Sequence, residues 1–94
     1  MSNDTTTQHD QLIAKCVEVA STVLGEREAI MQIRRGQPTF GRNYTVYYKV
    51  DLATLDPSGV NPTNQRCVVV SITSNMDSAK VEPSMSCDSV KDLD

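Results

Sequence analysis

The sequence predicts an α+β fold in which one N-terminal helix packs on an antiparallel sheet of about four strands. Between residues 10 and 25, apolar residues recur at steps of three and four, as they do on one face of a helix. Residues 44–52 alternate with a period of two and are rich in β-forming residues, which indicates a strand. Residues 66–73 and 79–87 also favour strands, and turn-forming residues separate them as in a hairpin.

The chain has 94 residues, which is the size of a single domain. The polar residues 1–9 are expected to form a flexible tail, residues 10–88 the domain, and residues 89–94 a frayed acidic tail. A domain of this size has a thin core, so a covalent cross-link would stabilise it appreciably.

The helix is expected to span about residues 10–25, with Asp10 as its N-cap and Gly25 as its C-terminal stop. Its apolar face is made of Leu12, Ile13, Cys16, Val17, Ala20, Val23 and Leu24. Residues 26–36 are ambiguous, since their propensity would continue the helix, whereas Met31 and Ile33 would lie on one face of a strand. The pattern alone leaves both interpretations open.

In the strand at 44–52, Tyr44 and Tyr48 are expected to face the core. Residues 66–73 are apolar on both faces, which is typical of a central strand. Pro83 within residues 79–87 indicates an edge strand or a bulge, because proline cannot donate a backbone hydrogen bond to a neighbour.

The hairpin predicts a disulfide. A turn centred near Asp77 places Cys67 opposite Cys87, and directly opposed side chains share one face at a separation close to that of a disulfide. Closing a loop of about 20 residues would contribute about 3 kcal/mol. The alternative is two free thiols in a reducing compartment, and in the bonded form Cys16 is left over.

Composition argues against several functions. The net charge of −3 gives no attraction to nucleic acid or to an anionic membrane, and no apolar run is long enough to span a bilayer. The cysteines lack metal-ligand spacing and the single histidine, His9, lies in the polar N-terminal segment, so no metal or other cofactor is expected. Paired carboxylates, a Ser-His-Asp set and a P-loop are not evident, and we therefore expect no enzymatic activity.

One segment resembles a known family. Residues 37–41, which read Gln37-Pro38-Thr39-Phe40-Gly41, are similar to the Gln-x-Val-x-Gly loop of the cystatins, with threonine where valine is usual. Asn43-Tyr44 follows as in many cystatins, and Cys67 and Cys87 have the spacing of the C-terminal disulfide of secreted members. The order of elements is also similar over residues 10–88. The resemblance implies a cystatin-like fold with a strand, not a helix, over residues 28–36.

The resemblance also implies a function. Cystatins inhibit papain-like cysteine proteases without reacting with them, by filling the active-site cleft with hairpin loops. The first loop would be Gln37, Pro38, Thr39, Phe40 and Gly41, and the second would contain Asn75 and Met76. The expected partner is thus a protein, a papain-like cysteine protease, and the expected location is extracellular if the disulfide forms.

The sequence departs from the cystatin pattern in two of the three contact regions. Residues 1–24 contain no glycine, and Asn75-Met76 stands where Pro-Trp is usual. An alternative interpretation is therefore a small acidic protein-binding module, such as a microbial or viral inhibitor or an immunity-type protein, without protease-inhibitor activity.

Overall fold

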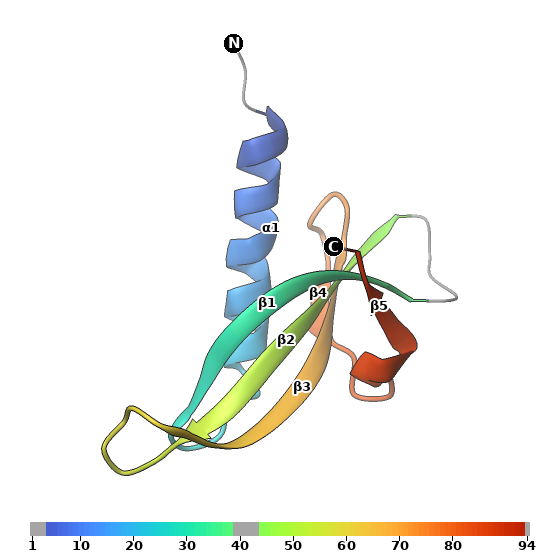
Figure 1. Cartoon of the computed structure of the whole chain (residues 1–94). Coiled ribbons are helices and arrows are strands. Elements are labelled where there is room, and N and C mark those ends of the chain that lie inside the picture. The colour runs from blue at the N-terminus through green and yellow to red at the C-terminus, as the bar shows by residue number, and fades with distance from the viewer. Residues whose placement is uncertain (1–3, 39–43, 94) are drawn as a thin grey trace.

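A computed structural model of the chain describes residues 4–38 and 44–93, with residues 4–8 described by their backbone alone. These residues form one helix and a five-stranded antiparallel sheet (Figure 1). The elements in order are α1 (Asp4–Ser21), β1 (Glu28–Pro38), β2 (Thr45–Leu55), β3 (Pro62–Thr73), β4 (Ala79–Val81), the short 3-10 helix η1 (Cys87–Ser89) and β5 (Val90–Asp92). The predicted α+β class is confirmed, with one more strand than expected.

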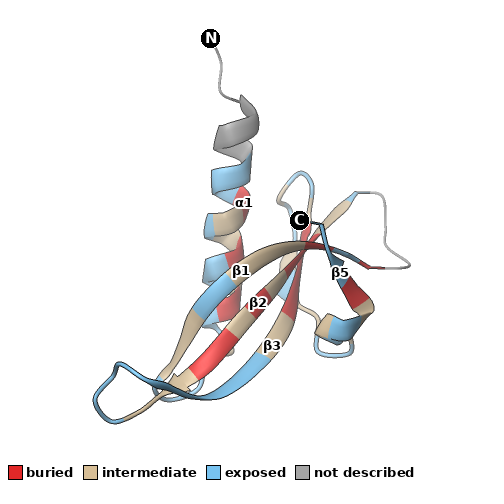
Figure 2. Ribbon diagram, viewed as in Figure 1, coloured by how far each residue is buried: buried red, intermediate tan, exposed pale blue. Residues whose placement is uncertain are grey.

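Helix α1 packs its apolar face on one face of the sheet. Figure 2 shows buried residues on the side of the helix that faces the strands and along β2 and β3. The fully or almost fully buried members of this helix-side core are Leu12, Cys16, Ala20, Tyr48, Val50, Leu52, Val70 and Ile72. The helix begins at Asp4, before the expected residue 10, because each residue added to a formed helix gains a backbone hydrogen bond. It ends at Ser21, and the N–H groups of Thr22 and Val23 close a tighter last turn.

The sheet has the order β4-β3-β2-β1-β5. The ambiguous stretch is a strand over Glu28–Pro38, paired with β2 from Glu28 to Gly36, so the helical alternative is wrong. The register shifts between Ile30 and Gln32, which makes Met31 the extra residue of a bulge. Ile30 and Ile33, on either side of the bulge, pack against the helix-side core, whereas Met31 is exposed and does not share a buried face with Ile33 as expected.

The face of the sheet opposite α1 carries a second, smaller apolar cluster. Tyr47 and Val69 lie on this face, and Val90 covers them together with Met85 and Cys87. The C-terminal segment therefore contributes to the core instead of fraying. The expectation of a tail over residues 89–94 is wrong for Val90–Asp92, which pairs with Gly36, Gln37 and Pro38 of β1.

The last predicted strand is shorter than expected. β4 pairs Ala79 with Ile72 and Val81 with Val70, and it ends at Val81 instead of continuing to residue 87. Pro83 follows and has no N–H for the ladder, so the chain leaves the edge of the sheet there. It then crosses to the opposite edge and ends as β5 (Figure 1).

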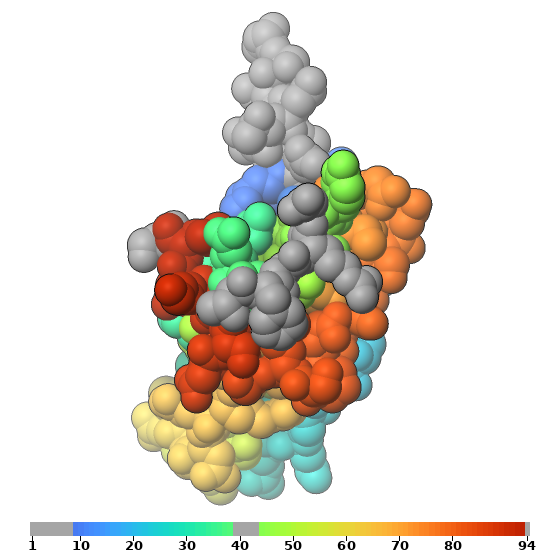
Figure 3. Space-filling view, turned by 90° about the vertical axis from the view of Figure 1, so that its right-hand side faces the viewer, coloured from blue at the N-terminus to red at the C-terminus, as the bar shows by residue number. Residues whose placement is uncertain are grey.

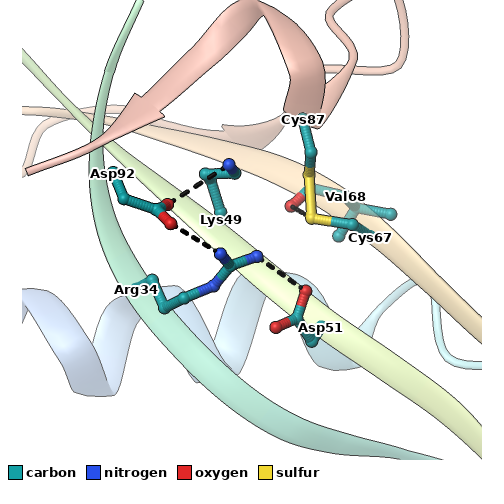
Figure 4. Close-up of polar contacts among 7 residues, drawn as sticks. All are labelled: Arg34, Lys49, Asp51, Cys67, Val68, Cys87 and Asp92. Carbon is teal, nitrogen blue, oxygen red and sulfur yellow. Dashed lines mark hydrogen bonds and ion pairs between the residues drawn. A yellow bond between two sulfur atoms is a disulfide. The ribbon is translucent and has the colours of Figure 1, made fainter.

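The predicted disulfide is confirmed: Cys67 and Cys87 are bonded, with their Cα atoms 6.2 Å apart (Figure 4). The geometry differs from the one argued above, because Cys87 lies in η1 and not opposite Cys67 in a continuous hairpin. The bond attaches the C-terminal segment to β3. Cys16 is free and completely buried.

Candidate functional site

The residue before β2 and the β3–β4 turn lie together at one end of the sheet. The backbone N–H of Ser74, in the β3–β4 turn, donates to the carbonyl oxygen of Tyr44, just before β2, at 2.9 Å. The surface view shows the start of β2 in green beside the orange β3–β4 turn (Figure 3). The structure thus brings the ends of both predicted loops to one side of the molecule.

The described part of the first loop is its N-terminal side. Gln37 is exposed and Pro38 is buried, and they pair with Lys91 and Val90 of β5 respectively. The predicted contact residues Thr39, Phe40 and Gly41 lie outside the described residues. The structure therefore shows how the loop is supported on the β1 side.

This β1 side of the loop is held from two directions. Gly36 lies against Val90, so closely that an added Cβ would overlap the Val90 Cγ1 atom. On the helix side, the Arg35 guanidinium donates to the carbonyl oxygen of Gly36 at 2.9 Å and lies over the Tyr48 ring, 5.8 Å from its centre. The backbone leading into the loop is therefore fixed by packing and by hydrogen bonds.

Charged side chains fasten β5 to the sheet (Figure 4). Asp92 accepts from Arg34 at 2.8 Å and pairs with Lys49 at 3.2 Å, and Arg34 also contacts Asp51 at 3.0 Å. Lys49 first, and Arg34 with it, lower the pKa of the Asp92 carboxyl below its usual value. These ion pairs connect the last strand to β1 and β2.

The second loop is held by its own side chains. The Asn75 amide oxygen accepts from the Asp77 N–H at 3.2 Å, and its amide nitrogen donates to the Asp77 carboxylate at 2.9 Å. Met76 has a φ of 63° and its half-buried side chain packs against the core under α1. Asn75 and Met76 thus make internal contacts, and much of the Met76 side chain is unavailable to a partner.

Tyr44 is exposed, so the expectation that it faces the core is wrong. Its residue exposure is 78%, whereas Tyr48 and Tyr47 are buried. Tyr44 continues the alternation of β2, but the covered part of the sheet ends before it, and a period of two does not reveal where a core stops. The one feature of the sequence that could have indicated the exposure of Tyr44 is its position just after the predicted loop.

The opposite end of the helix–sheet interface has a structural ion pair. Arg66 donates to both carboxylate oxygens of Glu28, at 2.6 and 2.7 Å, and to the Val23 carbonyl at 2.9 Å. The Gly25 N–H also donates to Glu28, at 2.8 Å. The Arg66 hydrogen bonds foremost lower the pKa of Glu28 to about 2. This cluster ties the end of α1 to β1 and β3.

The described residues offer little for chemistry. Within them, no group of three or more His, Cys, Asp or Glu side chains lies close enough together to hold a metal ion. Burial raises the pKa of the Cys16 thiol to about 12, which keeps it neutral and unreactive. The described part of the chain contains no helix that is both long and apolar enough to cross a membrane.

No protein-family model matches the chain, and neither does any curated protein or solved structure. The likeness to cystatins therefore stays a prediction that rests on the sequence motifs.

Proposed function

We propose that the protein is a reversible, non-covalent inhibitor of papain-like cysteine proteases that binds through the 37–41 loop. The observation that carries the proposal is the support of this loop. Val90 pairs with Pro38 and packs against Gly36, while a hydrogen bond from Ser74 to Tyr44 connects the residue before β2 to the β3–β4 turn. A loop whose two sides are fixed before binding loses little conformational entropy when it enters a cleft.

Such a mechanism needs shape and backbone contacts, not acids, bases or nucleophiles. It is compatible with a chain whose free thiol is buried and whose ion pairs hold the fold together. The protease would keep its own catalytic groups intact, so inhibition is expected to be reversed by dilution.

The expected affinity is modest. Residues 1–24 contain no glycine, and the Met76 side chain packs against the core instead of standing free. Loss of one buried anchor typically costs about 2–4 kcal/mol of binding, or roughly 30–1000-fold in affinity. We therefore expect binding in the micromolar range.

We further propose an extracellular location. The Cys67–Cys87 disulfide supports it, because disulfides persist mainly in oxidising compartments. In a reducing compartment the same chain would lose the bond that attaches its C-terminal segment to the sheet.

The test is a titration of papain activity, followed with a fluorogenic peptide, against the wild-type protein and two variants. Gly41→Trp bulks out the loop and is expected to remove inhibition while the protein stays folded. The matched control is Val60→Trp, which places the same side chain at a position 71% exposed in the β2–β3 connection, at the other end of β2 from the loop. Equal inhibition by the two variants would contradict the role of the loop.

The inward packing of Met76 favours one alternative, a protein-binding module without inhibitor activity. In that case the wild type leaves papain and its relatives fully active up to high micromolar concentration. Diluting the complex tests reversibility, because protease activity should return. Mass spectrometry of the same sample tests for cleavage of the protein, which would produce a new fragment mass.

A further inference from the structure

A shallow hollow of about 380 Å³ lies between the start of β2 and the β3–β4 turn. It is lined by Tyr44, Thr45, Thr73, Ser74, Asn75 and Asp77. Tyr44 and Asp77 are both exposed, so the residues that line the hollow include one accessible aromatic residue and one accessible acidic residue. Neither residue was predicted as part of the binding surface.

The walls of this hollow are fixed relative to each other. The Ser74–Tyr44 hydrogen bond joins the two walls, and the Thr73 and Ser78 backbones are bonded across the turn at 2.9 Å. Asn75 forms two hydrogen bonds with Asp77, and the Met76 side chain packs against the hydrophobic core and so fixes the turn. A ligand group would therefore meet a preformed site.

No cationic side chain that the structure describes pairs with Asp77. One carboxylate oxygen of Asp77 accepts a hydrogen bond from Asn75. An aromatic ring beside a carboxylate suits a planar cation, which stacks on the ring and donates to the oxygen atoms. Guanidinium meets both requirements better than ammonium, because it is planar and weakly hydrated.

We propose that this hollow is a subsite for an arginine side chain of the protein partner. The identification of that partner as a papain-like protease rests on the function proposed above, whereas the subsite itself rests on Tyr44 and Asp77. In the complex, the arginine would lie at the rim of the protease cleft, next to the start of β2. The arginine contact would then partly replace the contact with the protease that was expected of Met76.

The direct test is an NMR titration of the ¹⁵N-labelled protein with N-acetyl-arginine amide. We expect saturable shifts confined to Tyr44, Thr45 and residues 73–77, with half-saturation on the order of millimolar. N-acetyl-norleucine amide, which lacks the charge, should produce none of them. Unsaturable shifts, or shifts spread over the whole surface, would overturn the subsite.

Variants assign the binding to the two side chains. Tyr44→Ala and Asp77→Asn should each weaken the titration by about three- to fivefold, the range for an exposed cation–π or ion-pair contact. Tyr44→Phe keeps the ring and should bind as the wild type does. Asp88→Asn removes an exposed carboxylate in η1 and serves as the charge control.

The titration and the papain assay separate the two proposals. If the wild type does not inhibit papain but saturates with the arginine amide, the inhibitor proposal fails and the subsite remains. If the wild type inhibits papain and Tyr44→Ala and Asp77→Asn inhibit equally well, the subsite does not serve that complex. A flat arginine titration overturns the subsite whatever the inhibition result.

Discussion

Val90 occupies the space in which a side chain on Gly36 would lie. A Cβ at residue 36 would overlap the Val90 Cγ1 atom and would also come within 3.3 Å of the Lys91 carbonyl oxygen. This close approach allows β5 to pair with the end of β1 while Val90 covers Tyr47 and Val69. The glycine is thus required by the strand beside it, not by a turn.

Gly36→Ala should therefore lower the free energy of unfolding by about 1–3 kcal/mol, the usual cost of overpacking a well-filled site. Urea unfolding followed by circular dichroism measures the change. Gly25→Ala is the matched control, since its added Cβ would lie 3.5 Å from a Glu28 oxygen, an ordinary contact. In a Val90→Ala background, Gly36→Ala should cost less than in the wild type, because the shorter residue 90 leaves room for the added Cβ. An equal cost in the two backgrounds would contradict the contact.

The Glu28–Arg66 ion pair should make stability depend on pH. The pKa of Glu28 falls from 4.5 to about 2 on folding, so its contribution is fully present above pH 4.5 and is lost as the pH falls toward 2. Glu28→Gln should thus be less stable than the wild type near neutral pH, and the difference should vanish near pH 2. Urea unfolding at a series of pH values measures this, with the exposed neighbour Glu26→Gln as control.

Loss of the disulfide should release the C-terminal segment. The double variant Cys67→Ser/Cys87→Ser is expected to lose about 3 kcal/mol of stability, for a closed loop of about 20 residues. The amide of Leu93, which donates to the Arg35 carbonyl, should then exchange with solvent faster than amides of β2. A reductant should destabilise the wild type and leave the double variant unchanged. Non-reduced peptide maps showing three free thiols would contradict the bond.

Cys16 should resist alkylation in the native protein. Its side chain is completely buried, so the reagent cannot reach it, and its pKa is raised to about 12, so little reactive thiolate forms. Intact-mass measurement with iodoacetamide should show no adduct without denaturant and one adduct in urea. Ala14→Cys, an added thiol at an exposed position of α1, supplies the rapidly labelled control. Native labelling of Cys16 at the rate of that control would show that α1 detaches readily.

The sequence predicted the elements whose periodicity is long. The alternation of Val46, Tyr48, Val50 and Leu52 predicted the strand that is β2, and the apolar repeat through Leu12 and Cys16 predicted the helix. The central position in the sheet belongs to β2, although the apolar run of residues 66–73 is typical of a central strand. The sequence did not predict β5, because three residues carry no periodicity and their partner in β1 is distant in the chain. The disulfide was predicted correctly, but from a hairpin that ends before Cys87.

Candidate site residues were harder to predict, because exposure depends on where a core ends. Tyr44 shares the alternation of Tyr48, yet it lies beyond the helix-covered part of the sheet. Met76 looked like an exposed loop residue, but its positive φ and the short turn direct the side chain against the core. In both cases a tertiary contact or its absence decided the role, and single-sequence patterns do not encode such contacts.

The crossing of the C-terminal segment also suggests an order of folding. β1, β2 and β3 pair between neighbours in the chain, whereas the Arg34–Asp92 contact joins residues 58 positions apart. Closing long loops is slow, so the three-stranded meander is expected to form first and β5 to dock last. A bond between Cys67 and Cys87 would shorten that search, because it leaves the last strand only a few residues from a point already fixed on the sheet. Oxidation is therefore expected to accelerate the final folding step as well as to stabilise its product.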